Sequence, residues 1–295
     1  MAKPLRFTAS DGVHLAYSHT PGDPAQPALV LLHGWSGSRR YWDSAVPHLH
    51  RELGCPLYAL DLRWHGDSEG PGPGASGHLA RLAQDLEDFI QSRGGCGAFT
   101  PVFVGASMGA AVLWAWHAKF GTSTKQRHAF VFVDQAPLQN RAPGWELGSK
   151  GCFDGESLGR LQAALVSDLG AFADGNAACC LSRPITEATS ALLKAETLRC
   201  DPRRLGQLMA EHTAADWRPI LPTISAPCLV VYGPLSGCFP PEGCVYVAGA
   251  VQNGSAVAMP GCNHWCYLEQ PEAFARILAD FVARLARSGV GDDAA

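Results

Sequence analysis

A serine flanked by small residues lies between an apolar run and a helix-like stretch. The segment GASMG (105–109) directly follows the run 101–104 and directly precedes AAVLWAWHAKF. A strand that reverses so tightly into a helix strains the middle residue, and glycines on either side remove side chains that would clash. Ser107 would then project at a helix N-terminus, whose dipole favours negative charge. The pattern predicts a nucleophile; a tight turn of small residues is the alternative.

A serine hydroxyl is a weak nucleophile unless a base removes its proton. Among the eleven histidines, His264 lies in the polar loop PGCNHW (260–265), after a short apolar stretch and before the last helix-like segment. We expect His264 to be this base, with a surface loop residue as the alternative. Turnover should then rise with pH through one ionisation near or below neutrality, because the imidazole must be neutral to accept a proton.

The segment HGWSG (33–37) directly follows the apolar run 28–32. We expect it to contribute to the site through its backbone rather than through its side chains. Gly34 would let the main chain approach closely, and the N–H of Trp35 could point into the site. Together with the N–H of Met108 it would form an oxyanion hole, which stabilises negative charge on a substrate oxygen. His33 itself is expected to pack within its loop.

Five short apolar runs are expected to form the strands that position these residues. Stretches with helical spacing, such as the one from Leu79 to Ile90, separate them. Continuous apolar strands that alternate with amphipathic helices predict an α/β protein with a mostly parallel sheet covered on both faces. The runs are 28–32, 56–60, 102–104, 129–133 and 228–232.

The remaining segments suggest a core with one insertion. Residues 5–20 read as a hairpin around an Asp-Gly turn. The strand signal disappears between about 137 and 219. We therefore expect a core of 1–136 and 220–288, a helical cap of 137–219 and a disordered tail of 289–295. Helix-like pieces of the cap lie near 156–170, 187–197 and 202–214.

Composition narrows the class of partner. The 295 residues are 47% hydrophobic and 17% charged, which excludes a disordered chain or a coiled coil. A net charge of −4 without a basic run gives little support to nucleic-acid or membrane binding, so we expect a small-molecule substrate. The composition is also compatible with a homo-oligomer. No cofactor is expected: the glycines of 72–77 fit a dinucleotide fingerprint, but no strand precedes them.

Eleven cysteines are scattered along a chain whose first ten residues show no secretory signal. Reduced thiols and a cytoplasmic location are therefore expected, rather than a disulfide framework.

Four motifs in this order resemble the α/β-hydrolase superfamily. They are HGW (33–35), DLRWHGDS (61–68), GASMG (105–109) and NHWCYLEQPEAF (263–274). The resemblance extends from about residue 5 to 288 and is weakest in the cap. It implies an α/β-hydrolase fold, the order serine, acid, histidine, and acyl transfer to water through an acyl-enzyme. It does not choose among esterases, lactonases, amidases, thioesterases and cofactor-free haloperoxidases.

The acid departs from the commoner family pattern. The usual G-x-x-D after the penultimate strand is GPLS (233–236) here, without a carboxylate. The superfamily also places the acid after the strand that follows the nucleophile helix, where this chain has Asp134. We expect Asp134 to be the acid; a structural role for it, Glu242, or no acid remain the alternatives. Asp61 and Asp67 are expected to brace loops.

These observations together predict a serine-dependent carboxylic ester or lactone hydrolase, with Ser107, Asp134 and His264 as catalytic residues. A cofactor-free haloperoxidase or perhydrolase would use the same residues, with peroxide in place of water. A non-catalytic ligand-binding protein on this fold is another alternative. A metal site is a third, because soft ligands cluster near the C-terminus of the chain. They are Cys238, Cys244, Cys262, His264 and Cys266.

Overall fold

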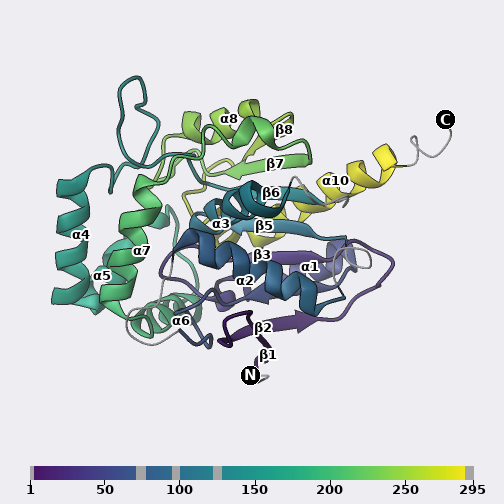
Figure 1. Ribbon diagram of the computed structural model, residues 1–295, viewed down its shortest axis with the longest axis horizontal. Helices are drawn as coiled ribbons and strands as arrows, with labels where there is room; N and C mark the ends of the chain where they lie inside the picture. The colour runs from purple at the N-terminus through teal and green to yellow at the C-terminus, as the bar shows by residue number, and fades with distance from the viewer. Residues whose placement is uncertain (1–2, 71–77, 95–99, 122–127, 290–295) are drawn as a thin grey trace.

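The computed structural model describes residues 3–70, 78–94, 100–121 and 128–289 (Figure 1). The glycine-rich loop 72–77 lies outside these ranges. Helix α10 (Pro271–Gly289) includes the first residue of the expected tail, and the rest of that tail also lies outside the described residues.

An eight-stranded sheet in the order β1-β2-β4-β3-β5-β6-β7-β8 forms the centre of the described chain. The β1–β2 and β2–β4 pairs are antiparallel, whereas the pairs from β4 to β8 are parallel. The predicted hairpin and the predicted mostly parallel sheet are therefore confirmed. The strands are β1 (Leu5–Thr8), β2 (His14–Thr20), β3 (Leu29–Leu32), β4 (Leu57–Leu60), β5 (Val102–Ala106), β6 (Ala129–Val133), β7 (Pro227–Tyr232) and β8 (Asn253–Ala258).

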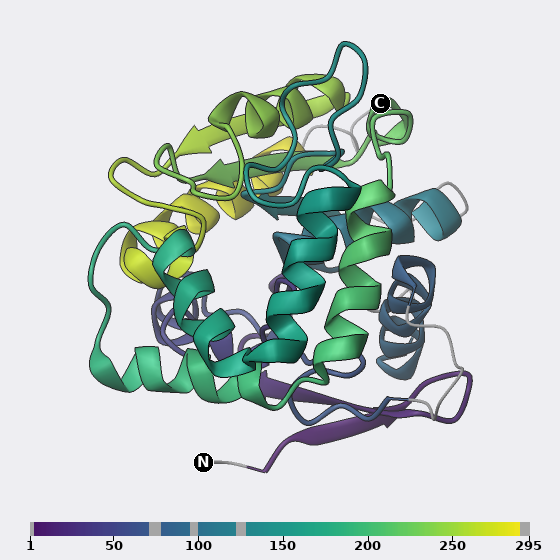
Figure 2. The same ribbon diagram turned by 90° about the vertical axis from the view of Figure 1, so that its left-hand side faces the viewer.

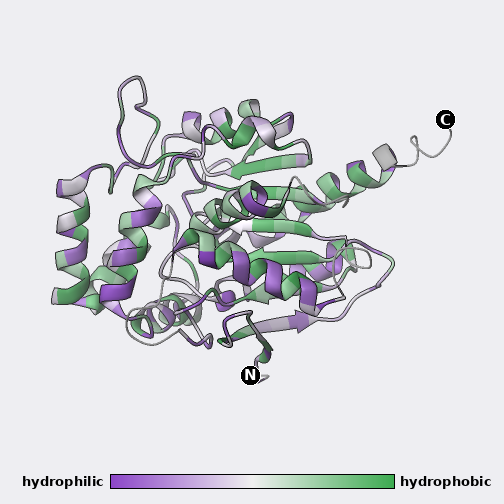
Figure 3. Cartoon of the chain, viewed as in Figure 1, coloured by the Kyte–Doolittle hydropathy of each residue, from purple (hydrophilic) through white to green (hydrophobic). Residues whose placement is uncertain are grey.

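Helices cover both faces of this sheet, as the apolar strands require. Along β3, Val30 and Leu32 belong to one buried cluster, while Leu29 and Leu31 belong to the other. The first cluster packs against α2 (Leu79–Ser92), α3 (Met108–Trp116) and α8 (Pro241–Ala250). The second packs against α1 (Val46–Leu53) and α10. Figure 3 shows the central strands mostly in the hydrophobic colour and the helices around them with both hydrophobic and hydrophilic residues.

Four helices follow β6 and precede β7. They gather at one end of the sheet, on the left of Figure 1 and facing the viewer in Figure 2. The expected piece 156–170 is two helices, because the Asp168 side chain accepts from the Ala171 N–H and begins a new helix. The four are α4 (Gly155–Ser167), α5 (Leu169–Cys180), α6 (Glu187–Leu198) and α7 (Pro202–Ala214).

Short helical segments complete the described elements. They are η1 (Arg39–Trp42), η2 (His117–Gly121), η3 (Leu221–Thr223) and α9 (Cys266–Glu269). No helix within the described ranges has the length and apolarity needed to cross a bilayer.

Candidate active site

Ser107 stands in a strained turn between β5 and α3. Its φ of 52° lies in the left-handed region, which is costly for a residue other than glycine. A Cβ on Gly105 would lie 2.5 Å from the carbonyl of Gly109, and a Cβ on Gly109 would lie 2.6 Å from the Leu32 oxygen. The two glycines are therefore needed for this turn to pack against the sheet, and the Ser107 N–H donates to the Val133 oxygen at 2.8 Å.

The HGW segment lies directly against the serine turn. A Cβ on Gly34 would lie 3.1 Å from the Ser107 Cβ, so glycine permits the close approach. Across the described residues, the backbone N–H groups of Trp35 and Met108 have no hydrogen-bond acceptor, and both residues flank Ser107. These free donors beside the hydroxyl have the chemistry that an oxyanion hole requires.

His33 packs within its loop. Its Nε2 accepts from the Leu62 N–H at 3.0 Å, and its Nδ1 lies 2.7 Å from the Gly34 oxygen. Burial lowers the pKa of His33 to about 4, so the ring is neutral and holds two loops together at neutral pH.

His264 pairs with Asp134 across 130 residues of sequence. Its Nδ1 lies 2.5 Å from Asp134 Oδ2, and both residues are buried. The hydrogen bond directs Nδ1 to the carboxylate, and the ring also hydrogen-bonds to the Cys238 thiol. Glu242, the other carboxylate considered, is exposed in the first turn of α8 and does not contact the ring.

Asp134 follows β6 with a φ of 49°. Its Oδ2 also accepts from the Ser236 hydroxyl at 2.6 Å, and its Oδ1 from the Gly233 N–H at 3.3 Å. Burial raises the pKa of Asp134, whereas the hydrogen bonds from His264 and Ser236 oppose that rise. Ser236, at the position where the commoner pattern has a carboxylate, therefore hydrogen-bonds to the carboxylate that follows the neighbouring strand β6. This role has no local sequence signal.

The Ser107 hydroxyl donates to Gln135 Oε1 at 3.4 Å. Among the described side chains, this weak bond is the one that the hydroxyl makes, and the hydroxyl is not bonded to His264. Ser107 and His264 nevertheless line the same cavity. Proton transfer would require the hydroxyl and the ring to come within hydrogen-bond distance, and catalytic hydrogen bonds often tighten only when substrate binds.

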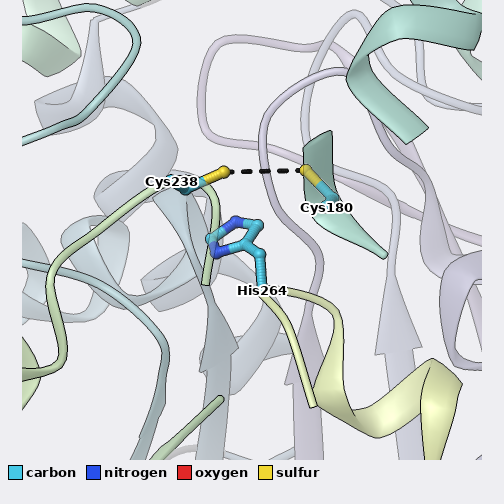
Figure 4. Close-up of side chains that lie close together, drawn as sticks. All are labelled: Cys180, Cys238 and His264. Carbon is cyan, nitrogen blue, oxygen red and sulfur yellow. Dashed lines mark hydrogen bonds between the residues drawn. The ribbon is translucent and has the colours of Figure 1, made fainter. Parts of the chain in front are cut away.

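Two cysteines stand beside the ring, as Figure 4 shows. Cys180 ends α5, Cys238 lies in the loop after β7, and their sulfur atoms are 3.6 Å apart. Hydrogen bonds from the thiols of Cys179 and Cys180, together with the charge of His264, lower the pKa of Cys238 against the effect of burial.

This cysteine also changes the expected behaviour of the base. Burial of the ring lowers the pKa of His264, but the Cys238 charge and the bond to Asp134 outweigh it and raise that pKa to about 10. We therefore expect the ionisation of His264 to control turnover at a higher pH than the sequence suggested.

The metal ligands suggested by sequence do not assemble as a set. Only Cys238 and His264 of those five lie together within ligand reach among the described residues, and the third member of that cluster is Cys180. Cys244 contacts Asp134 from the other side, at 3.8 Å, and Cys262 contacts Gln270. The sequence-based set was wrong because it was chosen by closeness along the chain. In the structure the loop after β7 faces the end of α5, which brings Cys180 to Cys238.

A cavity of about 170 Å³ lies between the sheet edge and the helices that follow β6. Its floor contains Ser107 and His264, and α4, α5 and α7 contribute to its walls. Its larger apolar lining residues are Trp35, Leu161, Phe172, Met209, Phe239 and Trp265. A cavity of this size and polarity fits a small, mainly apolar group next to the serine.

Curated relatives share sequence with most of the chain in one case and with a short segment of it in another. A pimeloyl-(acyl-carrier protein) methyl ester esterase of Aromatoleum aromaticum is 24% identical over 271 residues, covering 87% of this chain and 98% of that protein. A 2-succinyl-6-hydroxy-2,4-cyclohexadiene-1-carboxylate synthase of Salmonella agona is 41% identical, but over 64 residues, which are 22% of this chain and 24% of that protein.

Solved structures agree in fold. An esterase from Exiguobacterium antarcticum superposes with a TM-score of 0.85 at 17% identity, covering 95% of this chain and all of that one (100%). An enol-lactonase from Burkholderia xenovorans LB400 superposes with a TM-score of 0.77 at 19% identity and covers the same 95%. Residues 29–277 match the alpha/beta hydrolase family. The chain therefore belongs to the alpha/beta hydrolase family.

Proposed function

We propose that the protein is a serine hydrolase that cleaves a small carboxylic ester or lactone through an acyl-enzyme. The observation that carries this proposal is the buried Asp134–His264 pair, whose imidazole lines the same cavity as a serine in a strained turn. The printed names of an ester-cleaving relative and of an enol-lactonase structure agree with it. Residues 137–219 would then be the cap that shapes the substrate site.

In the first half of the reaction, His264 Nε2 takes the proton of Ser107 while Oγ attacks the substrate carbonyl carbon. The carbonyl electron pair moves onto oxygen, where the N–H groups of Trp35 and Met108 stabilise it. When the tetrahedral intermediate collapses, the C–O bond to the leaving group breaks and His264 returns the proton to that alcohol. A lactone would keep its alcohol tethered to the acyl group.

In the second half, water replaces the alcohol. His264 removes a proton from water, the hydroxide attacks the acyl carbon, and the acid leaves as the proton returns to Ser107 Oγ. Asp134 holds the ring in the tautomer that presents Nε2, and it offsets the positive charge that forms on the ring. The step uses only water as co-substrate.

The cavity also limits the size of the acyl group. At about 170 Å³ it is smaller than the roughly 300–1,000 Å³ that drug-sized ligands occupy. Trp35 and Phe172 meet edge to face, with ring centroids 5.5 Å apart, and join the core to α5 at this cavity. We therefore expect short acyl esters and small lactones to be better substrates than long-chain esters.

The test is a Ser107→Ala variant assayed with short-chain esters and with a fluorophosphonate probe. Loss of the nucleophile is expected to reduce turnover by ~10⁴–10⁶ and to abolish labelling, because Ser107 is the hydroxyl that lies beside the free N–H groups and shares the cavity with His264. Ser149→Ala is the matched control, since Ser149 lines the same cavity and should still label. If Ser107→Ala is folded by circular dichroism and retains a tenth of the wild-type activity, the proposal is wrong.

A further inference from the structure

We infer that Cys180, Cys238 and His264 form a binding site for a zinc ion, and that zinc bound there stops hydrolysis by occupying the base. The binding site stands on geometry alone. The inhibitory consequence rests on the proposed function, because only a base in use can be blocked. Figure 4 shows the two sulfur atoms facing each other with the imidazole ring directed between them.

The spacing of the three side chains suits tetrahedral zinc. The sulfur atoms of Cys180 and Cys238 are 3.6 Å apart, and these atoms and the ring nitrogen all lie within 4.8 Å of one another. Bond lengths of zinc to thiolate and imidazole place two thiolates about 3.8 Å apart, and a thiolate about 3.5 Å from the nitrogen. The ion therefore requires only small side-chain adjustments.

The imidazole is already oriented as a metal ligand. Because Nδ1 is bonded to Asp134, the nitrogen on the side of the two sulfurs is Nε2. Histidines that ligate zinc commonly direct their other nitrogen to a carboxylate, which fixes the tautomer and makes the ring a stronger ligand. Asp134 thus supplies to a metal the same support that it supplies to the base.

An ion from solution can reach this site. All three side chains line the cavity, which also contains Cys179. Cys179 is exposed, whereas Cys180 is buried and Cys238 is half-buried. Zinc would have its fourth position open to water from the cavity. Structural zinc sites are closed by four protein ligands, whereas three ligands leave the fourth position accessible to water and to a chelator from the cavity.

Binding and catalysis exclude each other at His264. When zinc binds, two protons leave for solvent, one from the Cys180 thiol and one from the hydrogen-bonded Cys238–His264 pair, and the Nε2 electron pair forms the bond to the metal. That pair can no longer accept the proton of Ser107, so the hydroxyl is not activated. Removal of the metal by a chelator returns both thiols and the ring to their former state without any oxidation or reduction.

The first arm of the test measures binding without catalysis. Ser107→Ala protein, freed of metal and kept reduced with a phosphine, is titrated with Co²⁺ and then competed with Zn²⁺. We expect one equivalent to bind, with a sulfur-to-cobalt charge-transfer band. Adding Cys180→Ala should weaken zinc binding at least about 100-fold, and adding Asp134→Asn about 10–100-fold. Cys55→Ala, at a buried cysteine that precedes β4, is the control and should bind as before.

The second arm measures ester hydrolysis in zinc buffers. Wild type should lose activity as free zinc rises and regain it when EDTA is added without further reductant, which excludes a disulfide as the cause. Each variant is compared with its own metal-free rate, and Cys180→Ala should need at least about 100-fold more zinc for half inhibition. If the wild type hydrolyses no ester, the proposed function fails while the first arm still decides the metal site.

Three results would overturn the inference. One is the absence of bound metal in the first arm. Another is equal zinc affinity in folded wild type and in a folded Cys180→Ala, Cys238→Ala double variant. The third is a bound zinc that leaves hydrolysis unchanged.

Discussion

Two buried aspartates, one after β4 and one after β6, show how the same residue type serves two purposes. Asp61 accepts from the backbone N–H groups of Arg39, at 2.6 Å, and Asp67, at 2.8 Å, and it pairs with the Arg39 guanidinium. Asp134 is equally buried, but its charged partner is the imidazole of His264, which lines a cavity. A guanidinium keeps its proton at any relevant pH, whereas an imidazole exchanges it.

The partner therefore decides the role. Asp61 closes a structural network, and the expectation that it braces its loop is confirmed by its backbone hydrogen bonds. A carboxylate that backs a titratable ring at a cavity can support proton transfer instead. Mutations that exchange or remove these partners should separate an effect on turnover from an effect on folding.

The largest expected effect is that of Asp134→Asn on turnover. An amide cannot offset the charge of the ring and can hold the wrong tautomer, so we expect a loss of ~10⁴ in kcat with the fold preserved. Steady-state kinetics on a short-chain ester would measure it, with circular dichroism as the check on folding.

A second substitution sharpens this result. Adding Ser236→Asp should restore part of the activity, because the Ser236 hydroxyl is already 2.6 Å from the carboxylate of Asp134. Glu242→Gln is the matched control and should change kcat little, since Glu242 is exposed. Full activity in Asp134→Asn, or a severe loss in Glu242→Gln, would contradict the assignment.

Asp61→Ala should instead destabilise the fold. It leaves the Arg39 guanidinium, whose side chain is 8% exposed, with Asp67 as its remaining carboxylate. Removing one partner of a buried pair costs on the order of 3 kcal/mol in the free energy of unfolding, which urea denaturation would measure. Asp67→Ala is the control: its side chain is 27% exposed, so a smaller loss is expected. Equal losses would show that burial does not distinguish the two carboxylates.

The smallest expected effect is a shift in the pH profile. Because a neutral ring is the active form and the pKa of His264 is raised to about 10, activity should rise with pH through a midpoint above 6.5. Cys238→Ala removes a negative charge that favours the protonated ring, so the midpoint should fall by about one pH unit or more. Profiles of kcat/KM measured with EDTA present would show it, and Cys55→Ala should leave the midpoint in place. An unmoved midpoint in folded Cys238→Ala would rule out this charge as the cause.

Much of the sheet could be predicted because its strands are apolar on both faces. Runs such as 129–133 have a pattern that few other elements share, and the strand found there has the predicted bounds. Helix α5 was not predicted as a separate helix because its sequence, LGAFADGNAACC, contains two glycines and little periodicity. Its start depends on the Asp168 cap, which a periodicity search does not detect.

The serine turn could be predicted from the sequence because all residues of its motif are contiguous. The position of Asp134 beside His264 required the sheet order, since 130 residues separate the two. The cluster of Cys180 and Cys238 was missed for the same reason, because 58 residues separate them and no local pattern joins a helix end to a distant loop. Sites built from one contiguous motif can thus be predicted from the sequence, whereas sites assembled from distant residues require the folded structure.

The left-handed backbone at Ser107 and Asp134 has a consequence for the evolution of this fold. Each conformation costs of order 1–3 kcal/mol in a residue with a Cβ, and glycine would adopt it at little cost. Selection for stability alone would therefore favour glycine at position 107, where the hydroxyl makes one weak hydrogen bond, whereas glycine at position 134 would also remove the hydrogen bonds to Gly233, Ser236 and His264. The serine turn is thus the place where stability and the proposed activity make opposite demands on one residue.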